Sequence, residues 1–332
     1  MLPKTGKTGN QMTGEGKQNY TFGERAELLR DDGDVTSWRI LDDTGFAKIS
    51  IYHVFPGIDL MYHDIRTSSI TIAEKSGEDL LRFDHCLEGR MEEYADSASG
   101  GLFYLTQGDL SIRKVRGGKH VSAFPMHFYR GITVFVELDK APKCIDCFME
   151  DVDVEPAALA RKFCSEPGGY VMRADASVVH ILSELYSVPE TIRKGYLKLK
   201  ILELFLFLSA AEMRPEQAEK QSLRKNGSLA DRARDYVLAQ MEKRVTIEEL
   251  SDVFHVSPTQ IKNSFRSAYG MPVYAYIRTQ KMHAAAELLR SGDATILEVA
   301  GRFGYDNGSK FAKAFRDVMG VTPKHYRKMS GN

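Results

Sequence analysis

The sequence predicts an α+β protein with an N-terminal β-barrel or sandwich, a helical segment, and a C-terminal all-α domain containing two helix-turn-helix units. Short alternating apolar runs fill the part before residue 140, and a broad apolar helical pattern follows them. One motif then occurs twice, about fifty residues apart, in the last third of the chain. With 332 residues and 43% hydrophobic content, the chain is long enough to bury two cores.

Changes in composition set the expected domain boundaries. We expect a disordered tail at 1–20, a β domain at 21–155, a helical segment at 156–215, a linker at 216–228 and the all-α domain at 229–330. The tail lacks the apolar core of a secretion signal, and no stretch reaches about eighteen apolar residues. We therefore expect a cytoplasmic protein that does not enter a membrane.

The β domain is predicted from alternating runs that are separated by glycine-containing turns. The expected strands are Ala47 to Phe55, Leu60 to Ile65, Leu80 to Glu88, Met91 to Tyr94, Gly101 to Thr106, Asp109 to Val115 and Gly131 to Leu138. Connections are expected at Gly89-Arg90, Gly100-Gly101 and Gly117-Gly118, among others. Many short strands at this spacing are typical of a sandwich or a small barrel.

The helical segment carries an apolar stripe of Val178, Ile181, Leu182 and Leu185. A broader apolar helix follows from Ile192 and Leu197 to Leu208. Nearly all faces of that second helix need to be covered, either by its own subunit or by a second copy of the chain.

The repeated motif predicts a helix, a tight turn and a second helix in each copy. Thr246 and Glu249, and again Thr295 and Glu298, have the spacing of a capping box, which starts the first helix. The corresponding landmarks of the two copies are Phe265-Arg266 and Phe315-Arg316, Gly270 and Gly320, Pro272 and Pro323, and Tyr276 and Tyr326. A long helix, Val273 to Arg290, is expected to fix the distance between the copies.

The second helix of each copy is expected to present polar residues to solvent. The first begins at Ser257-Pro258, and the second begins near Gly308. Buried phenylalanines leave Thr259, Lys262, Asn263 and Arg266 outward in the first, and Ser309, Lys310, Ala312, Lys313 and Arg316 outward in the second. Two such helices could enter the major groove of DNA, which makes sequence-specific DNA binding the leading interpretation.

Charge is divided unevenly along a chain whose 45 basic and 45 acidic residues cancel. From Ser228 onward there are 16 Lys and Arg against 11 Asp and Glu, which leaves 29 basic and 34 acidic residues before it. A net charge of +5 in the last part fits phosphate contact, and the acidic remainder is not expected to touch DNA.

Ser228 to Met329 resembles the AraC/XylS family of bacterial transcription regulators, above all in Ile296 to Tyr305 and in Gly320 to Arg327. The resemblance implies that the two second helices enter adjacent major grooves. It implies base contacts by Thr259, Lys262, Asn263, Ser309, Ala312 and Lys313. Arg266, Lys310 and Arg316 are expected to contact phosphates. Because Gly308 and Ala312 form few base hydrogen bonds, the second copy is expected to contribute more to positioning than to sequence discrimination.

The resemblance also implies a cupin-like N-terminal domain that binds a small-molecule effector, and a homodimer formed through the helical segment. The expected partners are promoter DNA, RNA polymerase, the effector and a second copy. Residues on the predicted strands that would suit a partly aromatic or anionic effector are His53, Tyr62, Arg82, His85, Arg90 and Tyr104. We expect no cofactor.

Two other functions remain open from the residues alone. A metal-dependent barrel enzyme usually has a His-x-His pair, which this chain lacks, although His53, His63 and His85 on separate strands leave a three-histidine site possible. Cys144 and Cys147 form a CxxC that could bind metal with Cys164 or act as a redox sensor. We expect neither a metal site nor an enzyme.

Overall fold

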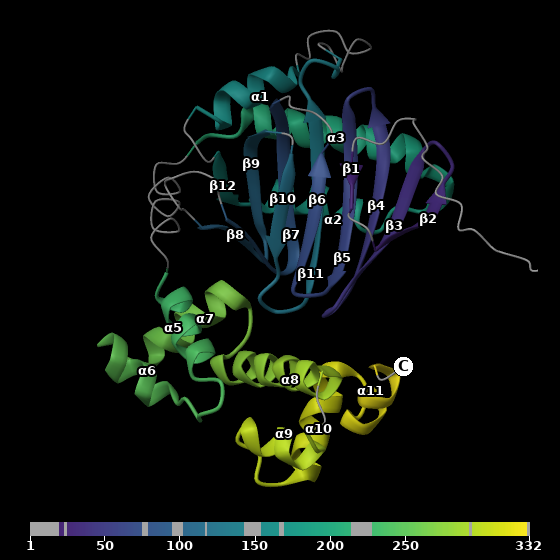
Figure 1. Cartoon of the computed structure of the whole chain (residues 1–332). Coiled ribbons are helices and arrows are strands. Elements are labelled where there is room, and N and C mark those ends of the chain that lie inside the picture. Colours follow the sequence, from purple (N-terminus) through teal and green to yellow (C-terminus); the bar gives the residue numbers. More distant parts are fainter. Residues whose placement is uncertain are drawn as a thin grey trace, which may run out of the picture.

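The computed structural model describes residues 20–22, 25–74, 79–94, 102–116, 118–142, 154–165, 169–213, 228–291 and 294–330. A curved β-sheet with helices on one side lies next to a C-terminal helical domain, as Figure 1 shows. Residues 1–19 of the predicted tail, most of the linker, and Cys144 and Cys147 lie outside the described residues, and Tyr20 belongs to the first strand. Within the described ranges, no helix combines the length and the apolar content that crossing a membrane requires.

Antiparallel strands form a half-barrel in the order β1-β6-β10-β7-β11-β5-β4-β3-β2, with β8 and β9 also paired to β7 and β12 paired to β9. The first six are β1 (Tyr20–Thr21), β2 (Ala26–Asp31), β3 (Val35–Asp42), β4 (Gly45–Phe55), β5 (Ile58–Arg66) and β6 (Ser69–Glu74). The others are β7 (Asp79–Tyr94), β8 (Leu102–Thr106), β9 (Asp109–Arg116), β10 (Lys119–Ala123), β11 (Tyr129–Glu137) and β12 (Tyr170–Arg173). The predicted β fold is confirmed as a half-barrel, but β12 lies in the segment that was predicted to be helical, where it pairs with β9.

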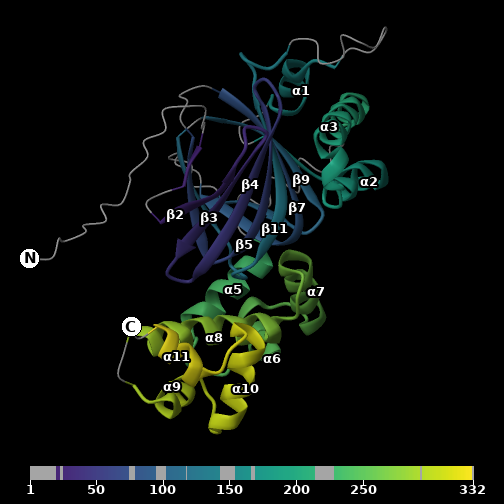
Figure 2. The same cartoon turned by 90° about the vertical axis from the view of Figure 1, so that its right-hand side faces the viewer.

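The two faces of the half-barrel have separate cores, because side chains alternate along each strand. Leu81 and Phe83 of β7 point to the outer face, where Phe83 lies 5.1 Å from Phe205, ring centroid to ring centroid. That face is covered by α1 (Pro156–Phe163), α2 (Ala176–Leu185) and α3 (Arg193–Ala210), with the 3₁₀ turn η1 (Glu190–Ile192) before α3, as Figure 2 shows. Leu80 and Cys86 belong to the second core, on the concave face.

Strand β7 is longer than predicted, and its extra length brings it into contact with further strands. The expected break at Gly89-Arg90 is absent, and β7 runs through it from Asp79 to Tyr94. Gly89 has a φ of +91°, and a Cβ there would lie 2.3 Å from the carbonyl oxygen of Phe128. Only glycine fits this position, so the strand bends there and continues to new neighbours, β8 and β10.

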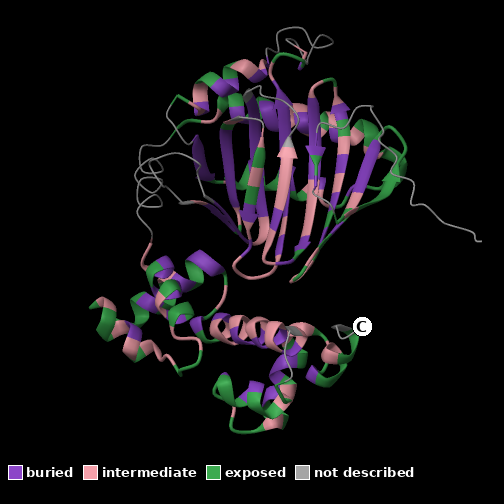
Figure 3. Cartoon of the chain, viewed as in Figure 1, coloured by how far each residue is buried: buried purple, intermediate pink, exposed green. Residues whose placement is uncertain are grey.

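The C-terminal domain contains the five predicted helices in order: α6 (Ile247–Phe254), α7 (Pro258–Tyr269), α8 (Val273–Ser291), α9 (Ile296–Arg302) and α10 (Gly308–Met319). Two further helices, α5 (Leu229–Ala239) and α11 (Pro323–Ser330), flank them. Two apolar clusters lie at the two ends of α8, one with Leu250 and Phe265 and the other with Val299 and Phe315. Figure 3 shows the resulting pattern of buried stripes and exposed outer faces on these helices. Each copy of the repeat therefore has its own small core.

Candidate nucleic-acid interface

The first reading head consists of α6 and α7, joined by a tight turn. Ser257 caps α7, because its hydroxyl accepts a hydrogen bond from the amide of Gln260 at 3.2 Å. His255 takes a left-handed conformation with a φ of +53° in the turn, and no local pattern predicted it. Gly270, with a φ of +68°, ends α7 as predicted.

Packing of the first head fixes which side of α7 faces outward. Phe265 is fully buried, and its ring lies 4.6 Å from that of Tyr269 and 5.3 Å from that of Tyr276. Ile261 is buried one turn earlier. The opposite side of α7 is exposed and includes Thr259, Lys262, Asn263 and Arg266.

The second reading head consists of α9 and α10 and repeats this geometry. Asn307 caps α10 by accepting hydrogen bonds from the amides of Ser309 at 2.8 Å and Lys310 at 3.2 Å. The helix begins at Gly308, where the sequence placed it, although the capping residue was missed. The predicted residues Ser309, Lys310, Lys313 and Arg316 are exposed, as is Asp317, and Ala312 is half-buried.

The two predicted capping boxes differ. Thr295 and Glu298 form the reciprocal pair, with hydrogen bonds of 2.6 and 3.2 Å. Thr246 accepts from the amide of Glu249, but the Glu249 carboxylate accepts from the hydroxyl of Tyr236 at 2.8 Å. The first box is therefore half formed, because a third helix supplies a better donor.

A buried lysine on α8 ties the two heads together, and the sequence reasoning missed it. The Lys281 ammonium donates to the carbonyl oxygens of Lys243, at 3.0 Å, and Phe303, at 3.1 Å. Burial lowers the pKa of Lys281. One carbonyl precedes α6 and the other ends α9, so this side chain joins both heads to the helix between them.

The predicted effector residues are not brought into one site. Tyr62 and His85 lie on the helix-covered face, where both contact the 185–186 turn: Tyr62 donates to the Leu185 carbonyl at 2.6 Å, and His85 lies 3.2 Å from the Tyr186 hydroxyl. His53 is paired with Asp59 at 2.8 Å near the rim. The other three are Arg82 on the concave face and Arg90 and Tyr104 next to the C-terminal domain.

Four charged residues fill part of the concave face with their own ion pairs. The Arg82 guanidinium contacts Asp84 at 2.7 Å and Glu93 at 3.0 Å, and Arg113 contacts the same two carboxylates at 3.1 and 2.9 Å. All four are buried. Arg82 is therefore engaged internally, so in this arrangement it does not offer a free fork to a ligand carboxylate.

Three cavities lie side by side near the start of α3, and they include two of the predicted effector residues. Cavities of about 150 and 680 Å³ are both lined by His53, Val54 and Lys194. A third, of about 230 Å³, is lined by Tyr62 and shares Tyr52 and Arg193 with the smallest one. Of the three, the cavity of about 680 Å³ falls within the usual size of small-molecule sites, about 300–1,000 Å³, and the other two are smaller.

A three-histidine metal site is not formed. His63 faces the concave side and contacts the Thr133 hydroxyl at 2.9 Å, whereas His85 faces the helices and His53 lies at the rim. Among the described residues, no group of three His, Cys, Asp or Glu side chains is placed to hold a metal ion. Cys86 and Cys164 are free thiols, and burial raises the pKa of both.

Comparisons with known proteins agree with this geometry. A family model described as a helix-turn-helix domain matches residues 250–329. The F1 operon positive regulatory protein of Yersinia pestis is 39% identical over 64 residues, which cover 19% of this chain and 21% of that protein. A putative AraC-like transcription regulator of Streptomyces lividans is 32% identical over 83 residues, 25% of this chain and 27% of that protein.

Among solved structures, the C-terminal domain of AraT, a response regulator from Geobacillus stearothermophilus, is 32% identical. The match covers 31% of this chain and 86% of that one, with a TM-score of 0.30. The chain spans only about a fifth to a quarter of the length of the two curated relatives.

Proposed function

This chain belongs to the AraC/XylS type of helix-turn-helix transcriptional regulators, and from that premise we propose that it controls promoters through two reading heads whose action a small molecule modulates. The observation that carries the proposal is the pair of capped helices, α7 and α10, with polar exposed faces. The helix α8 and its buried Lys281 hold the two at a fixed separation. That arrangement suits two successive major-groove contacts, about 10 bp or 34 Å apart.

The two heads are proposed to make different kinds of contact with DNA. Lys262 and Asn263 of α7 have side chains that form specific hydrogen bonds with base edges. Ala312 of α10 corresponds to Lys262 of α7, but it has no polar group and is half-buried. Lys310, Lys313 and Arg316 surround it, so the second head is proposed to bind phosphates more than bases.

Genome-wide mapping of the DNA that the full-length protein retains, followed by footprinting on the strongest fragment, tests the proposal. Protection of two adjacent major grooves on one face of the duplex is the expected result. Equal retention of all fragments, with no footprint, would reject sequence-specific regulation.

The effector site is proposed to be the group of cavities beside the start of α3. Tyr52 and Tyr62 offer aromatic faces, and Arg193 and Lys194 offer positive charge. The cavities are also lined by Asp34 and Glu190, and Lys194 is paired with Asp34 at 2.7 Å, so the lining suits a partly aromatic molecule better than an anionic one. A ligand that binds there would favour one arrangement of the domains, and so change promoter affinity or contact with RNA polymerase.

Homodimer formation is proposed to use the outer side of α3. This helix buries Leu204 and Phe205 against the half-barrel but leaves Leu199, Leu206 and Phe207 exposed by 65%, 43% and 42%. These three lie on the side of the helix that faces away from the sheet. Exposed apolar groups of this kind on a helix favour an interface with a second copy.

A further inference from the structure

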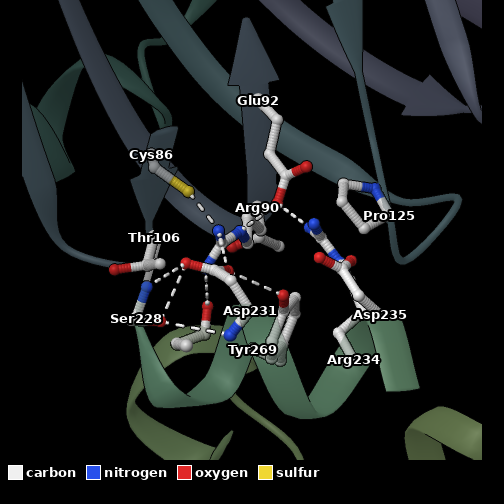
Figure 4. A network of polar contacts seen from close by, with 12 residues as sticks. Cys86, Arg90, Glu92, Thr106, Pro125, Ser228, Asp231, Arg234, Asp235 and Tyr269 are labelled. Carbon is white, nitrogen blue, oxygen red and sulfur yellow. Dashed lines mark hydrogen bonds and ion pairs between the residues drawn. The ribbon is translucent and has the colours of Figure 1, made fainter. Parts of the chain in front are cut away.

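The half-barrel and the first reading head are joined by a cluster of charges that crosses between them. Arg90 and Glu92 come from the end of β7, beyond the bend at Gly89, and Asp231 and Arg234 come from α5. Figure 4 shows these side chains pointing toward one another at the contact between β7 and the helices. We call these four residues, together with Tyr269, the interdomain latch.

Arg90 is at the centre of the latch and is fully buried. Its guanidinium donates to Glu92 at 2.6 Å, to Asp231 at 2.6 Å and to the carbonyl of Ala268 at 3.4 Å. It also lies between two aromatic rings, 3.8 Å from the centroid of Tyr104 and 4.6 Å from that of Tyr269. Two of these groups, Ala268 and Tyr269, end the recognition helix α7.

The remaining bonds of the latch make it charge-balanced. Arg234 donates to Glu92 at 2.6 Å, and the hydroxyl of Tyr269 donates to Asp231 at 2.9 Å. Burial raises the pKa of Asp231, but Arg90 and the Ser228 hydrogen bonds outweigh it and hold the pKa below its usual value. Two positive and two negative groups thus lose water together when the domains close, and they regain it when the domains separate. The net stabilisation of a buried pair is small for this reason, so the contact is reversible.

Closing the latch also places the half-barrel in front of part of the reading face. Asn263, Ser264 and Ser267 of α7 face Tyr104 and Thr106 across a gap of about 410 Å³. A major groove is about 12 Å wide and is bordered by two phosphate backbones, so a duplex needs far more room than this gap offers. With the domains closed, Tyr104 and Thr106 of β8 line the same gap as Asn263, so a duplex that approaches Asn263 from that side of α7 meets the half-barrel.

We propose that the interdomain latch is an autoinhibitory contact that holds the first reading head against the half-barrel and limits its access to DNA. The inference rests on the proposed function, because it takes α7 as a DNA-reading helix. Opening the latch frees Asn263 and the adjoining face of α7. The arrangement described above is then the restrained state of the protein.

The test compares latch variants of the full-length chain. Arg90→Met keeps a long side chain between the two tyrosines but removes the charge that Asp231 needs. Asp231→Asn removes the charge on the other side and retains an oxygen that can accept the hydrogen bonds from Ser228, the residue that caps α5. Arg113→Met is the matched control, because it breaks a buried ion cluster on the same half-barrel without touching the C-terminal domain.

Two measurements are made on each protein: the radius of gyration by small-angle X-ray scattering, and the affinity for a labelled duplex that the full-length chain selects from a random-sequence library. We expect both latch variants to expand and to bind the duplex about tenfold more tightly, which corresponds to about 1.4 kcal/mol. The double variant should gain no more than either single one, because both break the same contact. Arg113→Met should change neither quantity.

The outcomes separate the two proposals. If wild type and latch variants select the same sequence with equal affinity, the latch does not restrain DNA binding, and the proposed function stands. If the variants bind more tightly but Arg113→Met does so equally, the effect comes from a loosened half-barrel and the latch proposal is overturned. If no protein selects any sequence, the proposed function fails and this inference fails with it.

Discussion

A stacked pair of histidines at the domain contact makes the stability of the protein sensitive to acid. His127, in the turn before β11, lies parallel to His283 of α8, with ring centroids 3.5 Å apart and planes 9° apart. Burial lowers the pKa of His127 to about 4, against the opposing effect of Asp42. Burial and the adjacent His127 lower the pKa of His283 to about 3.

The direction in which stability changes with pH depends on whether the folded or the unfolded protein binds more protons. Both rings stay neutral in the folded protein well below the usual histidine pKa of about 6.5, whereas the unfolded chain takes up protons there. Their contribution is therefore fully present above about pH 6.5 and falls as the pH drops toward the folded pKa values. When the pH falls from about 7 to about 5, each ring lowers the free energy of unfolding by about 2 kcal/mol, and the pair lowers it by about 4 kcal/mol.

The perturbation is His283→Phe, which keeps a flat ring in the stack and removes one titrating group. Urea denaturation at about pH 7 and about pH 5, followed by the fluorescence of Trp38 and by circular dichroism, gives the free energy of unfolding at each pH. The difference between the two values is the acid-induced loss. We expect the acid-induced loss to be about 2 kcal/mol smaller in the variant. His63 and His85, whose pKa values burial also lowers to about 4, are common to both proteins and cancel in the difference. Equal losses in the two proteins would refute the assignment.

The remaining predictions concern DNA reading, packing and assembly. Lys262→Ala should weaken binding to the selected duplex by about 1–3 kcal/mol and relax base preference, whereas Arg316→Ala should weaken binding to cognate and scrambled duplexes alike. Titration of both duplexes checks this, and an equal loss of affinity for both duplexes in Lys262→Ala would contradict base reading. Phe265→Ala should destabilise the C-terminal domain by about 3–5 kcal/mol in thermal unfolding, and a loss below about 1 kcal/mol would mean that the site collapses around the gap. Gly89→Ala should lower the urea midpoint of the half-barrel, since the new methyl meets a backbone carbonyl at 2.3 Å; an unchanged midpoint would show that the strand shifts freely. Phe207→Asp should give monomers in sedimentation experiments with little change in stability, and an unchanged mass would place the dimer contact elsewhere.

The reading heads could be predicted because their signals are local. Ser257 before a proline, Gly270 at a helix end and the Thr295 capping box each determine a helix boundary within a few residues. The buried phenylalanines then decided which residues face outward. Long amphipathic helices with caps are the elements whose sequence pattern is least ambiguous.

Much of the half-barrel and all of the latch depend on contacts that the local pattern does not encode. β2 contains Arg30 and Asp31 and is mostly exposed, so it lacks the alternation of a half-buried strand. Gly89 was interpreted as a turn because glycine marks turns more often than bends within a strand. Arg90 and Asp231 are 141 positions apart, and a charged residue gives no sign of its partner until the fold brings the two together.

The rigidity of α8 also bears on how the target promoters can change over time. Its 19 residues, Val273–Ser291, span about 28 Å and do not stretch, and Lys281, near the middle of the helix, donates hydrogen bonds to both heads. A point mutation in an operator weakens one contact and can be compensated by another. Inserting a single base pair between the two half-elements instead turns the second by about 35° around the duplex, beyond the reach of a fixed head. Operators of this protein should therefore drift in base sequence while keeping their internal spacing.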